Sequence, residues 1–490
     1  MTAHAPKNLK GITMKAPFSE YLNSLMPGLK KLIELLGRDF SYVSILSTDS
    51  KGLTVSISRH AKSVGNRTVT TERGTVVRVY KDGLYSEYAL DRFDPEDPES
   101  AAKEIKETLD AQLEVLKENG CRIFETGELP DEPLELFVEK ETGVLPEETD
   151  LPELIALLSE ISDKGMALSE NVLDCITRAQ STHICKLFLT KNRCLRQSYV
   201  YSEGSVALVV GRDGQNKVGY KSVSALGGPE IFPGLADKLA PAARNAELML
   251  DSERIVPGEY DVIATPEVAG LIAHEAFGHG VEMDMFVKGR ALGADYIGKR
   301  VGSDLVTMHE GALCAENVTS YAFDDEGTLA GDVIEIDRGI LKTGICDALA
   351  AMRLGTVPTG NGKRENFEHK VYTRMTNTVF DTGSDSLEDM IASIKFGYLL
   401  DGVESGMEDP KHWGIQCIIQ MGHEIKDGKL TGKVVSPVIM TGYVPELLGN
   451  ITMAGTFSEI EGSGGCGKGH KEWVKVSDGG PYLKTKARLG

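Results

Sequence analysis

The sequence predicts an α+β protein, in which an N-terminal domain of helices and hairpins precedes a strand-rich C-terminal domain. Three observations predict this class. Apolar residues change between a helical period and a strand period several times along the chain. There are 53 glycines among 490 residues, against about 7% on average, which indicates many turns. The chain is also too long for one ordinary core, so two or three domains are expected.

The first 120 residues predict a helix, a set of strands and a second helix. The two helices are indicated by helical periodicity and the strands by period-two alternation, and glycine or proline residues mark the turns and ends. The expected elements are a helix over 18–37 interrupted at Pro27, strands within 39–90 with turns at Lys51-Gly52 and Asp82-Gly83, and a helix over 97–120 that stops at Gly120.

The next 130 residues repeat this order after an acidic segment near 124–150, which we interpret as an exposed linker. A helix is expected over 151–180, strands over 182–223, and a helix over 234–253 that contains Pro241. A domain boundary near residue 250 follows, which predicts an N-terminal domain of residues 1–250 and a C-terminal domain of residues 251–490.

The C-terminal half predicts mostly strands. A short strand, residues 261–264, leads directly to Thr265-Pro266, where threonine is a good N-cap and proline is favoured at the first helical position. A helix is therefore expected to begin at Pro266. Further expected elements are hairpins over 332–346 and 423–432 and one helix near 385–397.

Composition excludes two classes of function. The net charge of −20 repels phosphate backbones, so direct nucleic-acid binding is not expected. No run of 18 apolar residues exists to span a membrane, and the N-terminus has no signal-peptide pattern, so a cytoplasmic protein is expected. Met14 is an alternative start. The eight cysteines have no framework spacing, and we expect most of them to be buried free thiols.

The segment "HEAFGHGVEMD", residues 274–284, contains the most specific pattern. Its two histidines, His274 and His279, are five residues apart, whereas zinc peptidases commonly have H-E-x-x-H with a spacing of four. Positions five apart in a regular α-helix diverge by about 140°, so these side chains would not share a metal ion. The alternative is two unrelated histidines that are satisfied by core hydrogen bonds.

A π-bulge resolves the spacing, because it absorbs one extra residue and returns positions five apart to one face. Gly278 and Gly280 permit such a distortion. We therefore predict a wide turn or helix break between 274 and 280. If the histidines converge, Glu275 is a natural general base for a zinc-bound water.

"HEAFGHGVEMD" resembles the H-E-x-x-x-H signature of the TldD/PmbA metallopeptidase family. The segments "FDDEGT" (323–328), "RMTNT" (374–378) and "GGCGKG" (464–469) are similar to further family blocks, in the same order. Since the motif is complete, the chain resembles the active TldD type rather than the degenerate TldE or PmbA type. The resemblance implies zinc held by His274, His279 and Cys466, with Glu275 as the catalytic base.

Cys466 also has a physical rationale, because the surrounding glycines give its loop little bulk and let it approach a metal closely. His470, four residues later, is a rival ligand. Two segments depart from the family pattern, Asp381-Thr382-Gly383 and residues 405–414. We interpret both as loop changes near the substrate channel that affect substrate preference.

Several other residues have open roles. Arg374, Asn377 and Asp324-Asp325 lie in the family blocks, where they serve either turn hydrogen bonds or a substrate channel. Asp284 either orients a ligand or ends the helix. A second His-Glu pair, His423-Glu424, is interpreted as part of a surface strand.

The leading hypothesis is a zinc-dependent peptidase that hydrolyses small or unfolded peptides. The resemblance implies a dimer, either with a second copy or with an inactive TldE/PmbA-type paralogue. The alternative is a non-catalytic protein-interaction regulator, because the family carries the label "modulator of DNA gyrase". A structural zinc site is a third possibility, but such sites usually have four protein ligands.

Overall fold

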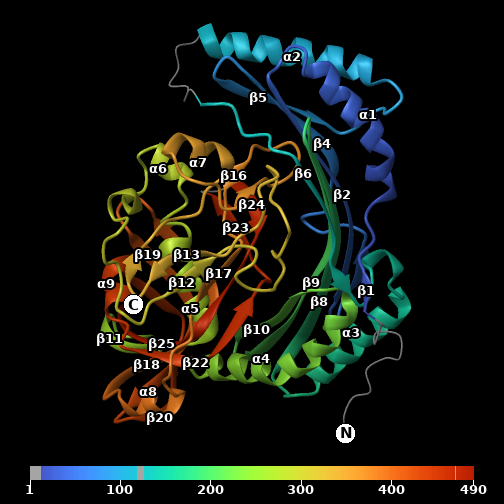
Figure 1. Cartoon of the computed structure of the whole chain (residues 1–490). Helices are drawn as coiled ribbons and strands as arrows, with labels where there is room; N and C mark the ends of the chain where they lie inside the picture. The colour runs from blue at the N-terminus through green and yellow to red at the C-terminus, as the bar shows by residue number, and fades with distance from the viewer. Residues whose placement is uncertain (1–12, 119–125, 469–470) are drawn as a thin grey trace.

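Two large β-sheets dominate the computed structural model of the chain, which describes residues 13–118, 126–468 and 471–490. One sheet is built from residues before 230 and the other from residues after 257. Figure 1 shows the first sheet and its helices beside the second, with α5 inside the C-terminal part. The chain is thus a mixed α and β protein, as the sequence predicts.

The N-terminal sheet has the strand order β10-β9-β8-β2-β4-β5, with β3 beside β2 and β6 beside β9. Its strands are antiparallel except for β6, which runs parallel to β9. The strands are β2 (Tyr42–Ile57), β3 (Lys62–Gly65), β4 (Arg73–Lys81), β5 (Leu84–Leu90), β6 (Leu134–Glu139), β8 (Val172–Thr190), β9 (Arg193–Arg212) and β10 (Gln215–Leu226).

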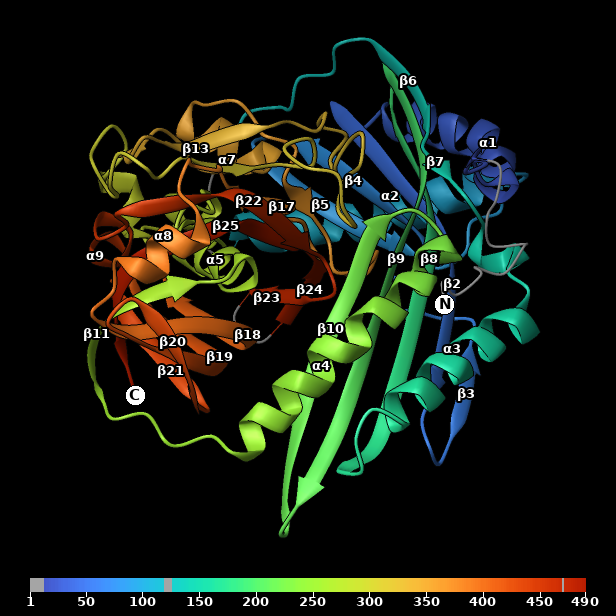
Figure 2. The same cartoon turned by 90° about the horizontal axis from the view of Figure 1, so that it is seen from below.

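Two pairs of helices cover this sheet, and each pair has its own core. Apolar residues of α1 and α2 pack on one end of the long strands, and those of α3 and α4 pack on the other end. Figure 2 shows α3 and α4 lying along the strands β8 and β10. The helices are α1 (Glu20–Leu36), α2 (Pro98–Glu118), α3 (Leu151–Met166) and α4 (Leu235–Leu250), with 3-10 turns η1 (Pro146–Glu148) and η2 (Pro229–Gly234).

The C-terminal sheet is mixed, with the order β11-β18-β19-β21-β25-β17-β12-β13-β14 and with β20 and β22 beside it. Its long members surround α5, whose apolar residues form one core with strand residues such as Leu400 and Leu483. The strands are β11 (Gly258–Ala264), β12 (Met308–Glu310), β13 (Val333–Asp337), β14 (Ile340–Leu341), β17 (Asn377–Phe380), β18 (Phe396–Asp409), β19 (Gly414–Lys426), β20 (Lys429–Val435), β21 (Val438–Tyr443), β22 (Met453–Glu461) and β25 (Ser477–Leu489).

Short helices and two-stranded pairs complete the fold. The small pairs are β1 (Met14–Lys15) with β7 (Glu141–Thr142), β15 (Gly362–Lys363) with β16 (Tyr372–Thr373), and β23 (Gly465–Lys468) with β24 (Lys471–Lys475). The helices are α5 (Pro266–Ala273), the π-helical turn η3 (His274–Gly278), α6 (Asp284–Val287), η4 (Leu292–Asp295), α7 (Ala348–Leu354), α8 (Leu387–Ala392) and α9 (Val444–Gly449).

The structure corrects several predicted elements. No turn occurs at Lys51-Gly52, because β8 pairs with β2 without a break there. The helix predicted over 151–180 ends at Met166, since residues from Val172 onward pair with β9. Helix α1 runs through Pro27, and α8 is shorter than the predicted 385–397.

The acidic segment near 124–150 is not simply an exposed linker. Its residues 134–139 form β6 within the large sheet, where the Phe137 ring contacts Phe18 and the Arg196 guanidinium. Gly120, the predicted end of the second helix, lies outside the described residues. The domain boundary near residue 250, which falls between α4 and β11, stays a prediction.

Two further expectations concern cysteines and membranes. Seven of the eight cysteines lie in the described ranges, all with free thiols, and five of those seven are buried. In these ranges, no helix combines the length and apolar character that crossing a bilayer requires.

Candidate metal centre

Helix α5 begins at Pro266, as predicted, and it is buried along most of its length. Thr265 occupies the N-cap position, but its side chain makes no capping hydrogen bond, and the hydroxyl has no partner. The start of the helix is therefore set by Pro266 and by burial, rather than by a threonine side-chain cap. This buried helix gives His274 a rigid support.

The backbone widens directly after α5 into a π-helical turn, His274–Gly278, where the wide turn was predicted. The His279 amide donates to the His274 carbonyl at 3.0 Å, which is a hydrogen bond across five residues. A Cβ at position 278 would lie 2.2 Å from Met375 Sδ, so a side chain there would displace Met375. The turn places the two imidazole rings 5.1 Å apart, centroid to centroid.

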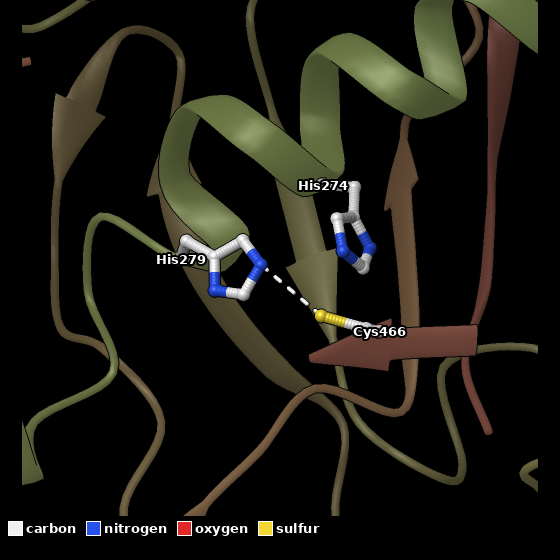
Figure 3. A group of neighbouring side chains, drawn as sticks. All are labelled: His274, His279 and Cys466. Atoms are coloured by element: carbon white, nitrogen blue, oxygen red, sulfur yellow. Dashed lines mark hydrogen bonds between the residues drawn. The ribbon is translucent and has the colours of Figure 1, made fainter. Parts of the chain in front are cut away.

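Cys466 joins the two histidines from a distant part of the chain. It lies on β23, and its Sγ is 3.1 Å from His279 Nε2. One ligand atom from each of His274, His279 and Cys466 lies within 4.8 Å of the other two. In Figure 3 both rings point toward the sulfur. The rival ligand, His470, lies outside the described residues.

Two carboxylates stand behind the histidines, and neither is among the residues predicted from the sequence. Glu282 Oε2 is 3.3 Å from His279 Nδ1, and Asp478 Oδ2 is 3.7 Å from His274 Nδ1. Glu282 follows His279 by three residues, which is a spacing that the sequence does offer. Asp478 comes from β25, and no sequence signal links it to His274.

Asp284 does not contact either histidine. Its carboxylate binds Lys468 Nζ at 2.6 Å and Lys288 Nζ at 3.0 Å. Lys468 also lies 3.2 Å from Glu282 Oε2, so Asp284 acts on His279 only through two intervening side chains.

Arg374 is fully buried and meets the sulfur directly. Its guanidinium donates to Cys466 Sγ at 2.9 Å, to the Cys466 carbonyl at 3.1 Å and to Glu282 Oε1 at 3.2 Å. It also donates to the Glu472 carbonyl on β24. One side chain thus connects the hairpin that carries Cys466 with the carboxylate behind His279.

The other residues from the similar blocks contact their own turns or the N-terminal sheet. Asn377 donates to the carbonyls of Gly311 and Ala315. Asp324 accepts from backbone amides of its own turn and from Gly362, while Asp325 pairs with Lys186. The contacts of Asn377 and Asp324 agree with the turn hydrogen bonds considered for them, whereas Asp325 forms an ion pair with Lys186 on β8.

Glu275 is buried beside the two histidines and faces β18. A Cβ at Gly406 would lie 2.5 Å from its Oε1, so the carboxyl group packs against this strand where the strand has no side chain. Burial raises the pKa of Glu275, and the nearby His274 and His279 oppose this shift. A raised pKa favours a carboxylate that accepts and returns a proton.

The sulfur and the two rings shift the pKa values of one another. Burial opposes ionisation of Cys466, but His279 and His274 outweigh it and hold the pKa of the thiol well below its usual range. Burial likewise opposes protonation of His274, yet Cys466 raises the pKa of this ring to about 9. The sulfur and the rings therefore favour one another's charged forms.

The donor set fits zinc. Two imidazole nitrogens and one thiolate are common zinc ligands, and three protein ligands are typical of catalytic sites. His274 Nδ1 has no hydrogen-bond partner, although it is buried. A metal at the other ring nitrogen would fix the proton on Nδ1, where it faces Asp478.

The two segments predicted to be loop changes lie in different places, and one of them is in part a strand. Residues 405–409 belong to β18, the strand that Glu275 faces, and Trp413 beyond them is buried. Asp381 follows β17 and lies 3.5 Å from His309, while Gly383 bonds to Gly455. Their effect on substrate preference stays a prediction.

His423 and Glu424 lie on β19, as the sequence predicts for a strand pair. His423 Nε2 is 4.0 Å from Asp401, and Glu424 accepts from Thr431. Neither residue belongs to a described group of metal-ligand atoms.

Comparison with known proteins gives a consistent picture. Residues 257–487 match the family described as the PmbA/TldA metallopeptidase C-terminal domain. A metalloprotease of Methanocaldococcus jannaschii is 33% identical over 252 residues, which are 51% of this chain and 55% of that protein. A metalloprotease of Synechocystis is 26% identical over 93% of this chain and 96% of its own length.

The match spans only about half the length of the first curated relatives. Across nearly the whole chain, the fold is similar to the crystal structure of TldE from Thermococcus kodakarensis, with a TM-score of 0.73 and 18% sequence identity. That alignment covers 94% of this chain and all of the other. At this level of identity the likeness concerns the fold alone.

Proposed function

Because the chain belongs to the TldD/PmbA metallopeptidase family, we propose that it is a zinc-dependent peptidase. Curated relatives are named metalloproteases, which supports a peptidase at the level of the family. The proposal for this chain assigns zinc to His274, His279 and Cys466 and general-base catalysis to Glu275.

One observation carries the proposal, namely that Cys466 converges with His274 and His279, although it lies 187 residues beyond His279 in the sequence. The π-helical turn has no evident purpose for two unrelated core histidines. It does bring side chains five residues apart onto one face, as a shared metal requires.

Zinc at this site would supply a Lewis acid for the scissile carbonyl and would lower the pKa of the attacking water. Glu275 would accept a proton from that water at its carboxylate and return the proton to the leaving amine. Glu282 and Asp478 would hold the histidine rings in orientation, and Arg374 would hold the sulfur. Three ligands leave a position open, which favours a catalytic over a structural site.

The substrate proposal is a small or unfolded peptide. His274, Glu275 and Cys466 are each at most 6% exposed, so a folded protein surface has no direct access to them. We also propose a dimer with a second copy or with a TldE/PmbA-type paralogue. This pairing is what the resemblance to the TldD/PmbA family implies.

Zinc K-edge absorption of the purified chain tests the site. We expect a zinc–sulfur component at about 2.3 Å that disappears in Cys466→Ala. Cys175→Ala, which removes a buried thiol of the N-terminal sheet, is the matched control and should keep it. A wild-type spectrum without sulfur would contradict the assignment of Cys466.

Substituting Glu275 by Gln separates the peptidase from a binding regulator. Peptide cleavage should be lost while zinc is retained, since Glu275 is not a proposed ligand. Cleavage that persists in this variant would contradict the role of Glu275. Partner binding without cleavage in the wild type would favour the regulator.

A further inference from the structure

A second cluster of metal-ligand residues lies apart from the candidate metal centre. It consists of Glu365, His369 and Glu472, and one ligand atom from each lies within 4.8 Å of the other two. Glu365 and His369 come from the segment between β15 and β16, and Glu472 comes from β24. We propose that these three residues form a second cation site that binds a divalent transition metal.

The distances within the cluster suit a coordination shell. His369 Nδ1 is 3.3 Å from Glu472 Oε2 and 3.6 Å from Glu365 Oε2. Ligand atoms bound at about 2.0–2.2 Å in a tetrahedral shell lie about 3.3–3.6 Å apart. Nδ1 carries at most one proton, so it forms one hydrogen bond, to Glu472, and leaves Glu365 without a proton from this ring.

His309 also contacts two carboxylates, but in an arrangement that does not suit a shared metal ion. Its Nδ1 is 2.8 Å from Asp332, and its Nε2 is 3.5 Å from Asp381. Each carboxylate there has a ring nitrogen of its own, on opposite sides of the imidazole. In the second cluster both carboxylates converge on the same nitrogen, which is the arrangement of ligands around one ion.

Charge and burial also favour a cation. Glu472 is only 7% exposed, and its described side-chain partner is His369. Glu365 Oε2 accepts from the Trp473 amide at 3.1 Å, which fixes it beside Glu472. Two carboxylate side chains converge here, and a divalent ion would balance their negative charge. His369 and Glu365 remain partly exposed, so an ion can enter from solvent.

The place of the cluster suggests a structural role. Glu472 lies on the same hairpin, β23–β24, as Cys466, and Arg374 donates to the carbonyls of both residues. Phe367, between Glu365 and His369, donates its amide to Glu72 of the N-terminal half at 2.9 Å. An ion here would fasten the cysteine-bearing hairpin to a segment that is itself fixed to the N-terminal sheet.

One imidazole and two carboxylates accept zinc and also harder ions such as manganese. The site does not depend on the proposed function, because none of its residues is a proposed ligand of the first centre. Its test therefore uses the full chain with that centre removed by His274→Ala and Cys466→Ala. Zinc uptake is then measured by elemental analysis at buffered free zinc.

We expect one zinc per chain in this background and none after the further change His369→Ala. The matched control, His309→Ala, should keep the zinc. If His369→Ala does not fold by circular dichroism, Glu472→Gln in the same background decides, with an expected loss of at least tenfold in zinc affinity. The proposal is overturned if the background binds no zinc, or if the zinc survives these changes.

The wild-type chain distinguishes this proposal from the proposed function. Two zinc ions per chain, one of them with a sulfur ligand, would support both sites. One zinc without a sulfur ligand would support only the second site. One zinc with sulfur that is lost in Cys466→Ala would support only the first and would overturn the second.

Discussion

The two halves of the candidate metal centre are built in different ways. His274, Glu275 and His279 lie within six residues of one buried helix and its π-helical turn. Cys466 lies on a two-stranded hairpin whose position depends on side chains far away in sequence, above all Arg374. The helix side is therefore fixed by local structure, and the hairpin side is fixed by tertiary contacts.

This difference teaches where each half is vulnerable. The helix side changes when a residue within the turn no longer fits. The hairpin side changes when any distant support is lost, because β23 and β24 form a sheet of their own rather than part of the large one. The predictions below test this contrast, starting with the largest expected effect.

The largest effect is expected on the helix side, in catalysis. Glu275→Gln keeps the shape of the side chain but removes the base, so kcat should fall by about 10²–10⁴-fold. Zinc content should not change. The measurement is peptide hydrolysis with parallel metal analysis. Glu424→Gln changes the other His-Glu pair, on β19, and should leave kcat unaltered.

The carboxylates behind the histidines come next. Glu282→Gln should weaken zinc binding by about 10–100-fold, because Glu282 orients His279 and also receives Arg374. Asp478→Asn should cost less, since Asp478 lies 3.7 Å from His274 and makes no hydrogen bond to it. Chelator competition measures the zinc affinity of both variants. An equal or larger loss in Asp478→Asn would contradict this ranking.

The glycine of the turn tests the helix side alone. In Gly278→Ala the new Cβ meets Met375 Sδ, which should lower the free energy of unfolding by about 1–3 kcal/mol. Met375→Ala removes the obstacle, so the double variant should be less destabilised than the sum of the two single changes. If the changes in unfolding free energy of the two single variants, measured by denaturant titration, add up to that of the double variant, the contact with Met375 is not the reason for glycine at position 278.

Part of this architecture was predictable from the sequence. Spacing and glycine positions predicted the wide turn, because a π-bulge is a local property of the backbone. Strand pairing was less accessible, since β2 continues through Gly52 only because β8 supplies a ladder partner there.

The hairpin side was accessible only through resemblance. The surrounding glycines make Cys466 a candidate ligand, but the sequence does not reveal which residues it meets. The contacts of Arg374 with Glu282 and of Asp478 with His274 depend on strands and turns that meet only in the fold. The convergence of His369 with Glu365 and Glu472 was invisible for the same reason, because two separate hairpins supply its ligands.

The remaining prediction links the two halves through pH. Cys466 helps to raise the pKa of His274 to about 9, and the ring must lose this proton before it binds a metal. Below about pH 9, zinc affinity should therefore increase with rising pH, by up to about tenfold per pH unit, because of the loss of this one proton. Above that pH the affinity should no longer depend on the protonation of His274.

Cys466→Ala removes the thiolate that favours the protonated ring. The pKa of His274 should then fall, and the dependence on pH should flatten at a lower pH than in the wild type. Chelator competition between pH 6 and 10 measures this in both chains. Identical profiles would mean that the hairpin does not control the protonation of the helix histidines. The two sides of the centre would then be independent in charge as well as in structure.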